Sequence, residues 1–216
     1  MNSDAVLRHI GLFGGTFDPP HNGHVALVEA GLNVMGLDEV WVIPAEPVHR
    51  ELSGFADGAK RLGWLQEIYK SRPEVQVFDW EVRLGRPVAA VETLRDFQQR
   101  YPGTVPWLML GADAWAGLES WREYPAHLEL CNIAVFARTG LDVEALPDHA
   151  GWQQVDVRQW QERNAPGHWC YLPVALPDIS ATMLRSDARQ GISLLGRVPE
   201  QVRSRIEMSY RVPPDR

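Results

Sequence analysis

Short apolar segments alternate with segments of helical periodicity along this chain, and this order constrains the fold more than any other feature. Brief apolar strands joined by helices are typical of parallel sheets covered on both faces. The strand-like segments are Ile10–Phe13, Val40–Pro44, Val75–Phe78, Trp107–Leu110, Ile133–Ala137 and Tyr171–Leu172. The helix-like segments are His24–Val34, Ala56–Tyr69, Val88–Gln99, Tyr124–Leu130, Thr182–Gln190 and Pro199–Met208. We therefore predict an α/β fold with a doubly wound parallel sheet and helices on both faces.

The length of 216 residues suits one α/β domain with a substantial core, so we expect residues 1–216 to form a single domain. A hydrophobic share of 45% and a charged share of 23% are ordinary for a globular protein. One stretch departs from the alternation: Leu141–His168 is polar and weakly periodic, and it carries Trp152 and Trp160. We interpret this stretch as an insertion or an irregular excursion.

The formal net charge of −7 argues against a nucleic-acid groove, because proteins with such a groove usually carry a basic face. A locally positive site for a small anion is still allowed. No apolar segment approaches the ~18 residues of a membrane span, and no signal peptide is recognisable, so we expect a cytoplasmic protein. Cys131 and Cys170 lack metal-ligand spacing and are expected to be reduced, buried thiols. The sequence leaves a homo-oligomer open.

The stretch from Gly14 to His24 combines three features that favour a phosphate site. The strand before it stops at Gly14 and Gly15, where the missing Cβ atoms let the backbone approach a ligand closely. A helical pattern begins after Pro20, and a helix N-terminus attracts anions. His21 and His24 are three residues apart, so both rings should lie on one face of the first turn. Together these features predict a binding site for a nucleotide phosphate.

Two other interpretations of the histidines are open. They could be a structural pair that caps the helix. They could also be two zinc ligands, but no third ligand is close in sequence, and Cys131 and Cys170 are distant.

Eleven consecutive residues, Gly14-Gly-Thr-Phe-Asp-Pro-Pro-His-Asn-Gly-His24, closely resemble the first signature of bacterial nicotinate-nucleotide adenylyltransferases. These enzymes belong to the nucleotidyltransferase superfamily with the pattern (T/H)xGH. The resemblance implies a Rossmann-like fold in which His24 contacts the α-phosphate of ATP and His21 assists phosphate binding. It also implies that ATP is bound by the preceding residues Gly14, Gly15, Thr16 and Phe17.

The run Ile179-Ser-Ala-Thr-Met-Leu-Arg185 is similar to the second signature of that family, ISSTxxR, with Ala181 in place of a serine. The resemblance implies that the β- and γ-phosphates are held by Arg185 and by the helix start, namely Ile179, Ser180 and Thr182. From spacing alone, an ordinary helix capped by Ser180 or Thr182, with a surface arginine, explains the run equally well.

Two further parts of the chain resemble the family's substrate-binding positions. Gly111 and Asp113 match a GxD element near the adenosine, and Trp121 matches a tryptophan around which the nicotinate ring packs. A turn with a helix cap, and a tryptophan that anchors a helix, are the alternatives. Arg138 matches an arginine near the ATP.

The loop that ends in His49-Arg50 matches a basic pair that meets nucleotide phosphates, although a solvated surface loop is an equal alternative. Because this loop, the Gly14–His24 stretch, Gly111–Asp113 and Arg138 all follow strands, we expect them to converge on one crevice.

The chain departs from the family where the family's Ser-Tyr-Thr triplet lines the pyridine nucleotide pocket. Here the triplet is Val88-Ala89-Ala90, which lacks the aromatic ring and a hydroxyl, although backbone amides could still bind a carboxylate. The acceptor is therefore less constrained by the sequence than adenylyl transfer itself.

The resemblance implies adenylyl transfer from ATP to nicotinic acid mononucleotide, which yields deamido-NAD and pyrophosphate in NAD biosynthesis. Mg²⁺ is expected to accompany ATP and to be held by the nucleotide and water, with no metal cage of protein ligands. Three alternatives stay open: another acceptor (nicotinamide mononucleotide or phosphopantetheine), a non-catalytic nucleotide-binding homologue, and a zinc hydrolase. The Gly111–Tyr124 match argues against phosphopantetheine, intact His21, His24 and Arg185 argue against a non-catalytic homologue, and missing ligands argue against zinc.

Overall fold

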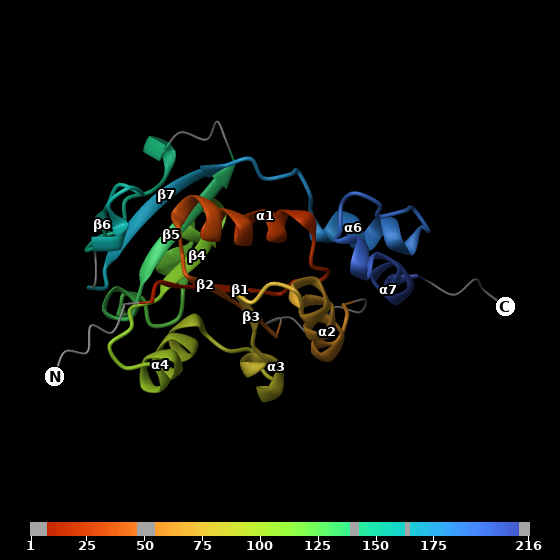
Figure 1. The fold of residues 1–216 in the computed structure, drawn as a ribbon, viewed down its shortest axis with the longest axis horizontal. Helices are drawn as coiled ribbons and strands as arrows, with labels where there is room; N and C mark the ends of the chain where they lie inside the picture. Colours follow the sequence, from red (N-terminus) through yellow and green to blue (C-terminus); the bar gives the residue numbers. More distant parts are fainter. Residues whose placement is uncertain (1–7, 47–54, 139–142, 163–164, 212–216) are drawn as a thin grey trace. The chain divides into compact units, whose positions relative to one another are not determined.

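A computed structural model describes residues 8–46, 55–138, 143–162 and 165–211 of the chain. These residues form a seven-stranded sheet of order β3-β2-β1-β4-β5-β7-β6, with helices around it (Figure 1). The strands are β1 (Ile10–Gly15), β2 (Glu39–Pro44), β3 (Val75–Val77), β4 (Trp107–Gly111), β5 (Asn132–Arg138), β6 (Gln153–Gln154) and β7 (His168–Val174). The pairs β1–β4, β4–β5, β5–β7 and β6–β7 are parallel, which confirms the predicted doubly wound, Rossmann-like α/β fold.

The strand order reverses at β1, because the chain runs outward to β3 on one side and resumes at β4 on the other. Ligands of open α/β sheets bind beyond the carboxyl ends of strands where the order reverses. The carboxyl end of β1 is Gly14-Gly15, the start of the first predicted phosphate-binding stretch.

Most helices fall close to the predicted segments. The helices are α1 (Asn22–Ala30), α2 (Gly58–Tyr69), α3 (Trp80–Leu84), α4 (Ala90–Arg100), α5 (Ala112–Ala116), α6 (Ala181–Arg189) and α7 (Glu200–Tyr210). Of these, α3 and α5 had not been predicted. α1 continues as a π-helical turn, Gly31–Met35, which ends at Gly36 in the left-handed conformation. Short 3₁₀ turns occupy Leu118–Ser120, Ala126–Glu129, Val143–Ala145 and Trp160–Glu162.

Two predictions on secondary structure were wrong. The segment Tyr124–Leu130 is not an α-helix but carries only the 3₁₀ turn Ala126–Glu129. Pro125 explains the difference, because proline has no N–H to donate and disfavours helical geometry at the residue before it. The stretch Leu141–His168 is not wholly irregular, since it supplies β6, which pairs with β7. Trp152 and Trp160 are buried within it, and Trp160 Nε1 donates a hydrogen bond of 2.7 Å to the carbonyl of Met35.

The chain divides into two compact units. The first comprises Met1–Phe13, Glu29–Trp41 and Ala89–Ala175, and the second comprises Gly14–Val28, Val42–Val88 and Leu176–Arg216. The expectation of a single domain stays a prediction.

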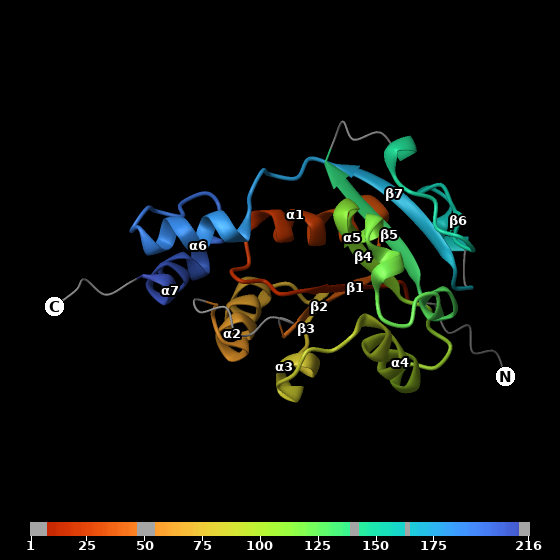
Figure 2. The ribbon, with the colours of Figure 1, turned by 180° about the vertical axis from the view of Figure 1, so that it is seen from behind.

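The core of the first unit is built on β4 and β5, whose apolar residues are buried along both strands. α5 packs over these two strands, as Figure 2 shows. α4 forms because its apolar residues Val91, Leu94 and Phe97 recur at helical spacing, and this buried face packs Phe97 against Trp41 at a ring distance of 5.2 Å. The apolar pattern therefore explains both the helix and its packing.

The second unit has its own core beside the carboxyl end of β1. α6 and α7 lie side by side and α7 also packs on α2 (Figures 1 and 2). The core is made of apolar side chains from these three helices and their connections: Trp64, Leu184, Ala188, Leu194, Val198, Val202, Ile206 and Tyr210. This packing places the second predicted phosphate-binding run on the same unit as the first.

Candidate functional site

The turn between β1 and α1 is held in one conformation by buried side chains. Phe17 has a φ of 49°, in the left-handed region that non-glycine residues seldom adopt, and its ring is 2% exposed. A Cβ at Gly15 would lie 3.2 Å from that ring, which explains the need for glycine there. Asp18, Pro19 and Pro20 are also buried. The backbone ahead of α1 is therefore fixed before any ligand arrives.

His21 and His24 stand together at the start of α1. Their rings are stacked with centroids 3.7 Å apart, as the three-residue spacing predicted, and the edge of Phe17 meets the His24 ring at 4.8 Å. His21 precedes the helix, and its carbonyl accepts the N–H groups of His24 and Val25 at 2.9 and 3.2 Å. A Cβ at Gly23 would lie 3.0 Å from the His21 ring. The glycine between the histidines therefore makes room for the ring stack.

One hydrogen bond determines which nitrogen of His24 carries the proton. The backbone N–H of His21 donates to His24 Nδ1 at 3.2 Å, so Nδ1 is an acceptor and is not protonated. The neutral ring then has its proton on Nε2, which makes Nε2 a hydrogen-bond donor. A backbone N–H held by the side chain three residues later has the geometry of one half of a capping box. His24 thus orders the helix start and also presents an N–H donor.

Burial keeps both imidazoles neutral. It lowers the pKa of His21 to about 4, and burial together with the nearby His21 lowers the pKa of His24 well below its ordinary value. His21 Nδ1 is buried and makes no hydrogen bond with any of the described residues. A phosphate near these rings would favour protonation and would accept from their N–H groups. The pair therefore suits an anion that arrives rather than a resident cation.

The lowered pKa of His21 predicts a pH-dependent stability. In the unfolded chain the ring takes up a proton below a pKa of ~6.5, whereas in the folded protein it does so only near pH 4. The unfolded state therefore binds more protons in this window, and stability falls as the pH drops from about 6.5 to about 4. We expect His21 to contribute roughly 2–3 kcal/mol to the loss between pH 7 and pH 4.5.

Urea unfolding of the ligand-free protein at both pH values measures this loss. His21→Gln is the matched variant. Its free energy of unfolding should decrease less between the two pH values than that of the wild type, by about the contribution expected of His21. Equal losses in the two proteins would contradict the prediction.

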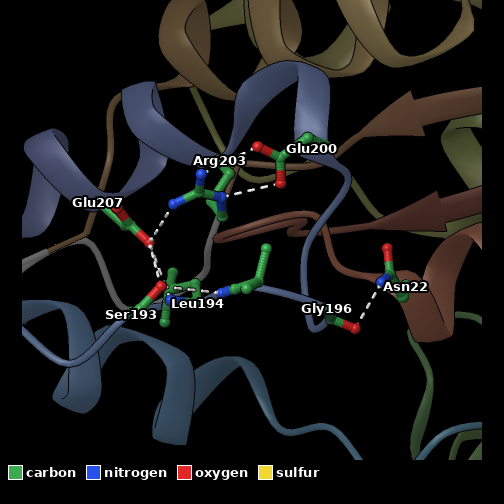
Figure 3. A network of polar contacts seen from close by, with 8 residues as sticks. Asn22, Ser193, Leu194, Gly196, Glu200, Arg203 and Glu207 are labelled. Carbon is green, nitrogen blue, oxygen red and sulfur yellow. Dashed lines mark hydrogen bonds and ion pairs between the residues drawn. The ribbon is translucent and has the colours of Figure 1, made fainter.

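Asn22, between the two histidines, ties the start of α1 to the loop that joins α6 and α7. Its backbone N–H donates to the Arg197 carbonyl at 2.9 Å, and its side-chain amide donates to the Gly196 carbonyl at 2.8 Å. Figure 3 shows how this loop is held in turn by α7, where Glu207 accepts the N–H of Leu194 at 2.8 Å. Glu207 is itself paired with Arg203 at 3.3 Å. The carboxyl-terminal helices thereby fix the helix that carries the histidines.

Arg185 connects the run Ile179–Arg185 to the Gly14–His24 stretch. Its Nη1 donates to the Asp18 carbonyl at 2.5 Å, and its guanidinium lies 4.5 Å from the centre of the Phe55 ring. Its Nη2 donates to Thr182 Oγ1 at 3.2 Å. The guanidinium is therefore oriented by partners on both sides of the turn, within the second unit.

The capping alternative for the second run is not supported. Ser180 is the N-cap residue of α6 by its backbone conformation, but its side chain makes no capping hydrogen bond. Ser180 and Thr182 are exposed, whereas Ile179 packs against the core of the second unit. The helix start therefore leaves the hydroxyls at the surface.

The remaining predicted residues are spread over other parts of the chain. In the first unit, Gly111 ends β4 as the N-cap residue of α5, and Asp113 is exposed in the first turn of that helix. Trp121 is half-buried, with its ring edge-on to His127 at 5.8 Å, and Arg138 is the last residue of β5. The triplet Val88-Ala89-Ala90 is half-buried at the start of α4, where the backbone N–H of Ala89 donates to Glu92 at 3.4 Å.

The structure thus brings together only part of the predicted site. The first stretch and Arg185 meet within the second unit. His49 and Arg50 lie outside the described residues. Convergence of all these loops on one crevice stays a prediction.

Sequence reasoning missed the support that three buried polar residues give to the site. Asp18 is 2% exposed, Arg61 is 1% exposed and Tyr210 is 6% exposed. Arg61 lies three and four residues before Trp64 and Leu65, so it shares the buried face of α2. It donates to the carbonyls of Thr16 and Ala45 at 2.6 and 2.7 Å. Long-range pairings of this kind have no local signal in a single sequence.

Over the described ranges, no three His, Cys, Asp or Glu side chains gather as metal ligands would, and no helix is long and apolar enough to cross a membrane. Cys131 and Cys170 are both free and buried, and burial raises the pKa of each thiol.

Comparison with known proteins places this geometry in a class. A cytidylyltransferase-like family model matches residues 12–187, which include both predicted phosphate-binding runs. Two relatives carry the description "probable nicotinate-nucleotide adenylyltransferase". The one from Chromobacterium violaceum is 37% identical over 183 residues, 82% of this chain and 85% of the relative. The one from Thermotoga maritima is 31% identical over 204 residues, 94% of this chain and 93% of the relative.

A solved structure shows the same fold. The nicotinic acid mononucleotide adenylyltransferase of Plasmodium falciparum, complexed with NaAD, superposes with a TM-score of 0.67 at 15% identity, over 94% of both chains. The chain has the fold and the signature residues of a nucleotidyltransferase. Within that class, it belongs to the nicotinate-nucleotide adenylyltransferase family.

Proposed function

We propose that this protein transfers the adenylyl group of ATP to nicotinic acid mononucleotide, releases pyrophosphate and forms deamido-NAD, a step of NAD biosynthesis. The observation that carries the proposal is the stacked, neutral His21–His24 pair at the start of α1, tied through Asp18 to Arg185. Family membership supports the choice of substrates.

In the proposed mechanism, a phosphate oxygen of the mononucleotide attacks the α-phosphorus of ATP in line. The new P–O bond forms as the bond to the β-phosphate oxygen breaks, and pyrophosphate leaves with that electron pair. His24 Nε2–H and His21 stabilise the charge that grows on the α-phosphoryl oxygens, together with the backbone amides of Gly15 and Thr16. Arg185 binds the leaving phosphates. No covalent intermediate with the protein is needed.

The other substrate contacts are proposed from the family resemblance. Gly14 and Phe17 line the ATP phosphates with Gly15 and Thr16. ATP is further bound by Gly111, Asp113, Arg138, Ile179, Ser180 and Thr182, and the mononucleotide is bound by Trp121, His49, Arg50, Val88, Ala89 and Ala90.

We also propose that Mg²⁺ enters with ATP. We expect this ion to be held by the phosphates of the nucleotide and by water. Such an ion neutralises the β- and γ-phosphates when bound.

The buried free thiols fit a reducing, cytoplasmic location.

Pyrophosphate release from ATP, measured with a panel of acceptors, tests the proposal. Nicotinic acid mononucleotide should give the highest kcat/KM, above nicotinamide mononucleotide and phosphopantetheine. A helix N-terminus favours a carboxylate over a neutral carboxamide, and the first turn of α4, which begins at Ala90, presents such N–H groups. Equal values for acid and amide would mean that Val88-Ala89-Ala90 has changed the acceptor. Absence of turnover with every acceptor would favour the non-catalytic alternative.

Arg185→Ala is expected to raise the Kd for ATP and pyrophosphate by about 10- to 100-fold. A charge-assisted contact to a phosphate is worth roughly 1.5–3 kcal/mol. Titration calorimetry measures both constants, and Arg189→Ala, an exposed arginine one turn further along α6, is the matched control. Normal ATP binding with lost mononucleotide binding would mean that the two substrates are assigned the wrong way round.

Trp121→Ala is expected to raise the KM for the mononucleotide while ATP affinity stays nearly unchanged. Stacking of an aromatic ligand on the indole contributes ~0.5–1.5 kcal/mol beyond area burial, so a rise of about three- to tenfold is expected. Trp121→Phe keeps a smaller ring, so its KM for the mononucleotide should lie between those of the wild type and Trp121→Ala. An equal rise in the KM for both substrates would argue for a structural role against His127.

A further inference from the structure

The network around Asp18 connects the last helix of the second unit to the first phosphate-binding stretch. Tyr210, at the end of α7, donates its hydroxyl hydrogen to Asp18 Oδ1 at 2.5 Å. The backbone N–H of Ala56 donates to the same oxygen at 3.0 Å. Asp18 is 2% exposed, so these two donors act on a carboxylate that water does not reach. They fix the direction in which its other oxygen points.

That other oxygen lies toward Arg185. Asp18 Oδ2 is buried and lies 3.9 Å from Arg185 Nη1, and it makes no hydrogen bond within the part of the chain that the structure describes. The same nitrogen donates to the Asp18 main-chain carbonyl at 2.5 Å. One residue thus holds the guanidinium through its backbone and attracts it with its side chain. The orientation of Asp18 therefore sets the position of Arg185.

Phe55 supports the guanidinium from a second direction. The Arg185 Cζ atom lies 4.5 Å from the centre of the Phe55 ring, within the range of a cation–π contact. The side chain of Arg185 is 13% exposed, so little of the cation is left to water. An arginine held in this way has lost much of its rotamer freedom before a ligand binds, which reduces the entropy cost of binding.

Tyr210 is suited to act as a permanent donor. Burial, together with the hydrogen bond to Asp18, raises the pKa of its phenol, so it stays protonated at every working pH. Its ring packs in the apolar core of the second unit, 6.2 Å from the ring of Trp64. The hydroxyl is therefore held at Asp18 by the packing of α7.

We infer that Tyr210, acting through Asp18, and Phe55 are positioning residues that hold Arg185 ready for the β- and γ-phosphates of ATP. The inference rests on the proposed function, in which Arg185 binds the leaving group. It adds that ATP binding by the Gly14–His24 stretch and the Ile179–Arg185 run depends on the Tyr210 hydroxyl, which comes from α7, the last described helix. Neither residue is expected to touch substrate.

The test is a double-mutant cycle on ligand binding. Tyr210→Phe removes only the hydroxyl, and Phe55→Leu removes only the aromatic face. Each should raise the Kd for ATP and for inorganic pyrophosphate by roughly five- to tenfold, and leave the Kd for nicotinic acid mononucleotide unchanged. In an Arg185→Ala background both effects should vanish, because the group that they position is gone. Ser209→Ala, which removes an exposed hydroxyl from the same helix, is the control and should change neither constant.

The outcomes separate the two proposals. Effects of Tyr210→Phe and Phe55→Leu that persist in the Arg185→Ala background, or that weaken both ligands equally, overturn the inference, because a general structural role would produce them. No change in ATP binding with either variant also overturns it, while a normal effect of Arg185→Ala leaves the proposed function standing. If Arg185→Ala itself binds ATP normally, the inference falls together with the proposed role of Arg185, and the acceptor panel still decides the proposed function. Thermal melting of Tyr210→Phe checks folding, and Phe55→Leu gives an independent answer should that variant be unstable.

Discussion

His24→Ala is expected to lower kcat by about 10²–10³, the usual cost of removing one donor that stabilises transition-state charge. The physical reason lies in the tautomer. Because Nδ1 accepts the backbone N–H of His21, the proton is on Nε2, and the neutral ring is a fixed donor at pH 7. The capping hydrogen bond contributes about 1 kcal/mol to stability, and the ring contacts with His21 and Phe17 are lost with it. Steady-state kinetics and urea unfolding measure the two effects separately.

His24→Gln is the matched variant, because glutamine three residues after the N-cap can accept the same backbone N–H. It should recover the stability that this hydrogen bond contributes but not the rate, since its amide cannot place a donor where Nε2 lies. A folded His24→Gln or His24→Ala protein with unchanged kcat would mean that the imidazole has no part in the chemistry.

The sheet could be predicted from the sequence because buried parallel strands are continuous apolar runs. β2 and β4, for example, begin or end within one residue of the predicted segments. Helices shorter than two turns could not be predicted. α3 and α5 have five residues each, too few to show a 3.6-residue period. The predicted helix at Tyr124–Leu130 failed because Pro125 overrides the apolar spacing around it.

The candidate site likewise has a part that could be predicted from the sequence and a part that could not. The contiguous Gly14–His24 stretch could be recognised because its chemistry is local: glycines, a helix start and two histidines one turn apart. The residues that support it are far away in the chain. Tyr210 reaches Asp18 across 192 positions, and Arg61 reaches Thr16 across 45. Such pairings follow from packing of whole helices, which no local pattern encodes, and the assigned substrate roles stay predictions.

Arg61 is the buried residue whose replacement should cost the most stability. Its side chain is 1% exposed and is paired with Glu46, whose side chain is 2% exposed, at 3.3 Å. Its other hydrogen bonds go to the carbonyls of Thr16, Ala45 and Ala56. These carbonyls belong to loops that follow β1 and β2 and to the approach to α2. One guanidinium therefore holds three backbone segments of the second unit, including the turn between β1 and α1.

Arg61→Met is expected to lower the free energy of unfolding by about 3–5 kcal/mol, because it leaves the Glu46 carboxylate buried without its cation. Urea unfolding at pH 7 measures the change. Arg100→Met is the control, since it breaks the exposed pair with Asp96 at 2.8 Å, and such pairs are worth only ~0.3–0.5 kcal/mol. Adding Glu46→Gln to Arg61→Met should recover part of the loss, because the neutral amide removes the buried charge but not the three carbonyls that have lost a donor. A loss below about 1 kcal/mol for Arg61→Met would mean that water or a rearranged loop replaces the guanidinium, and that the turn before α1 does not depend on it.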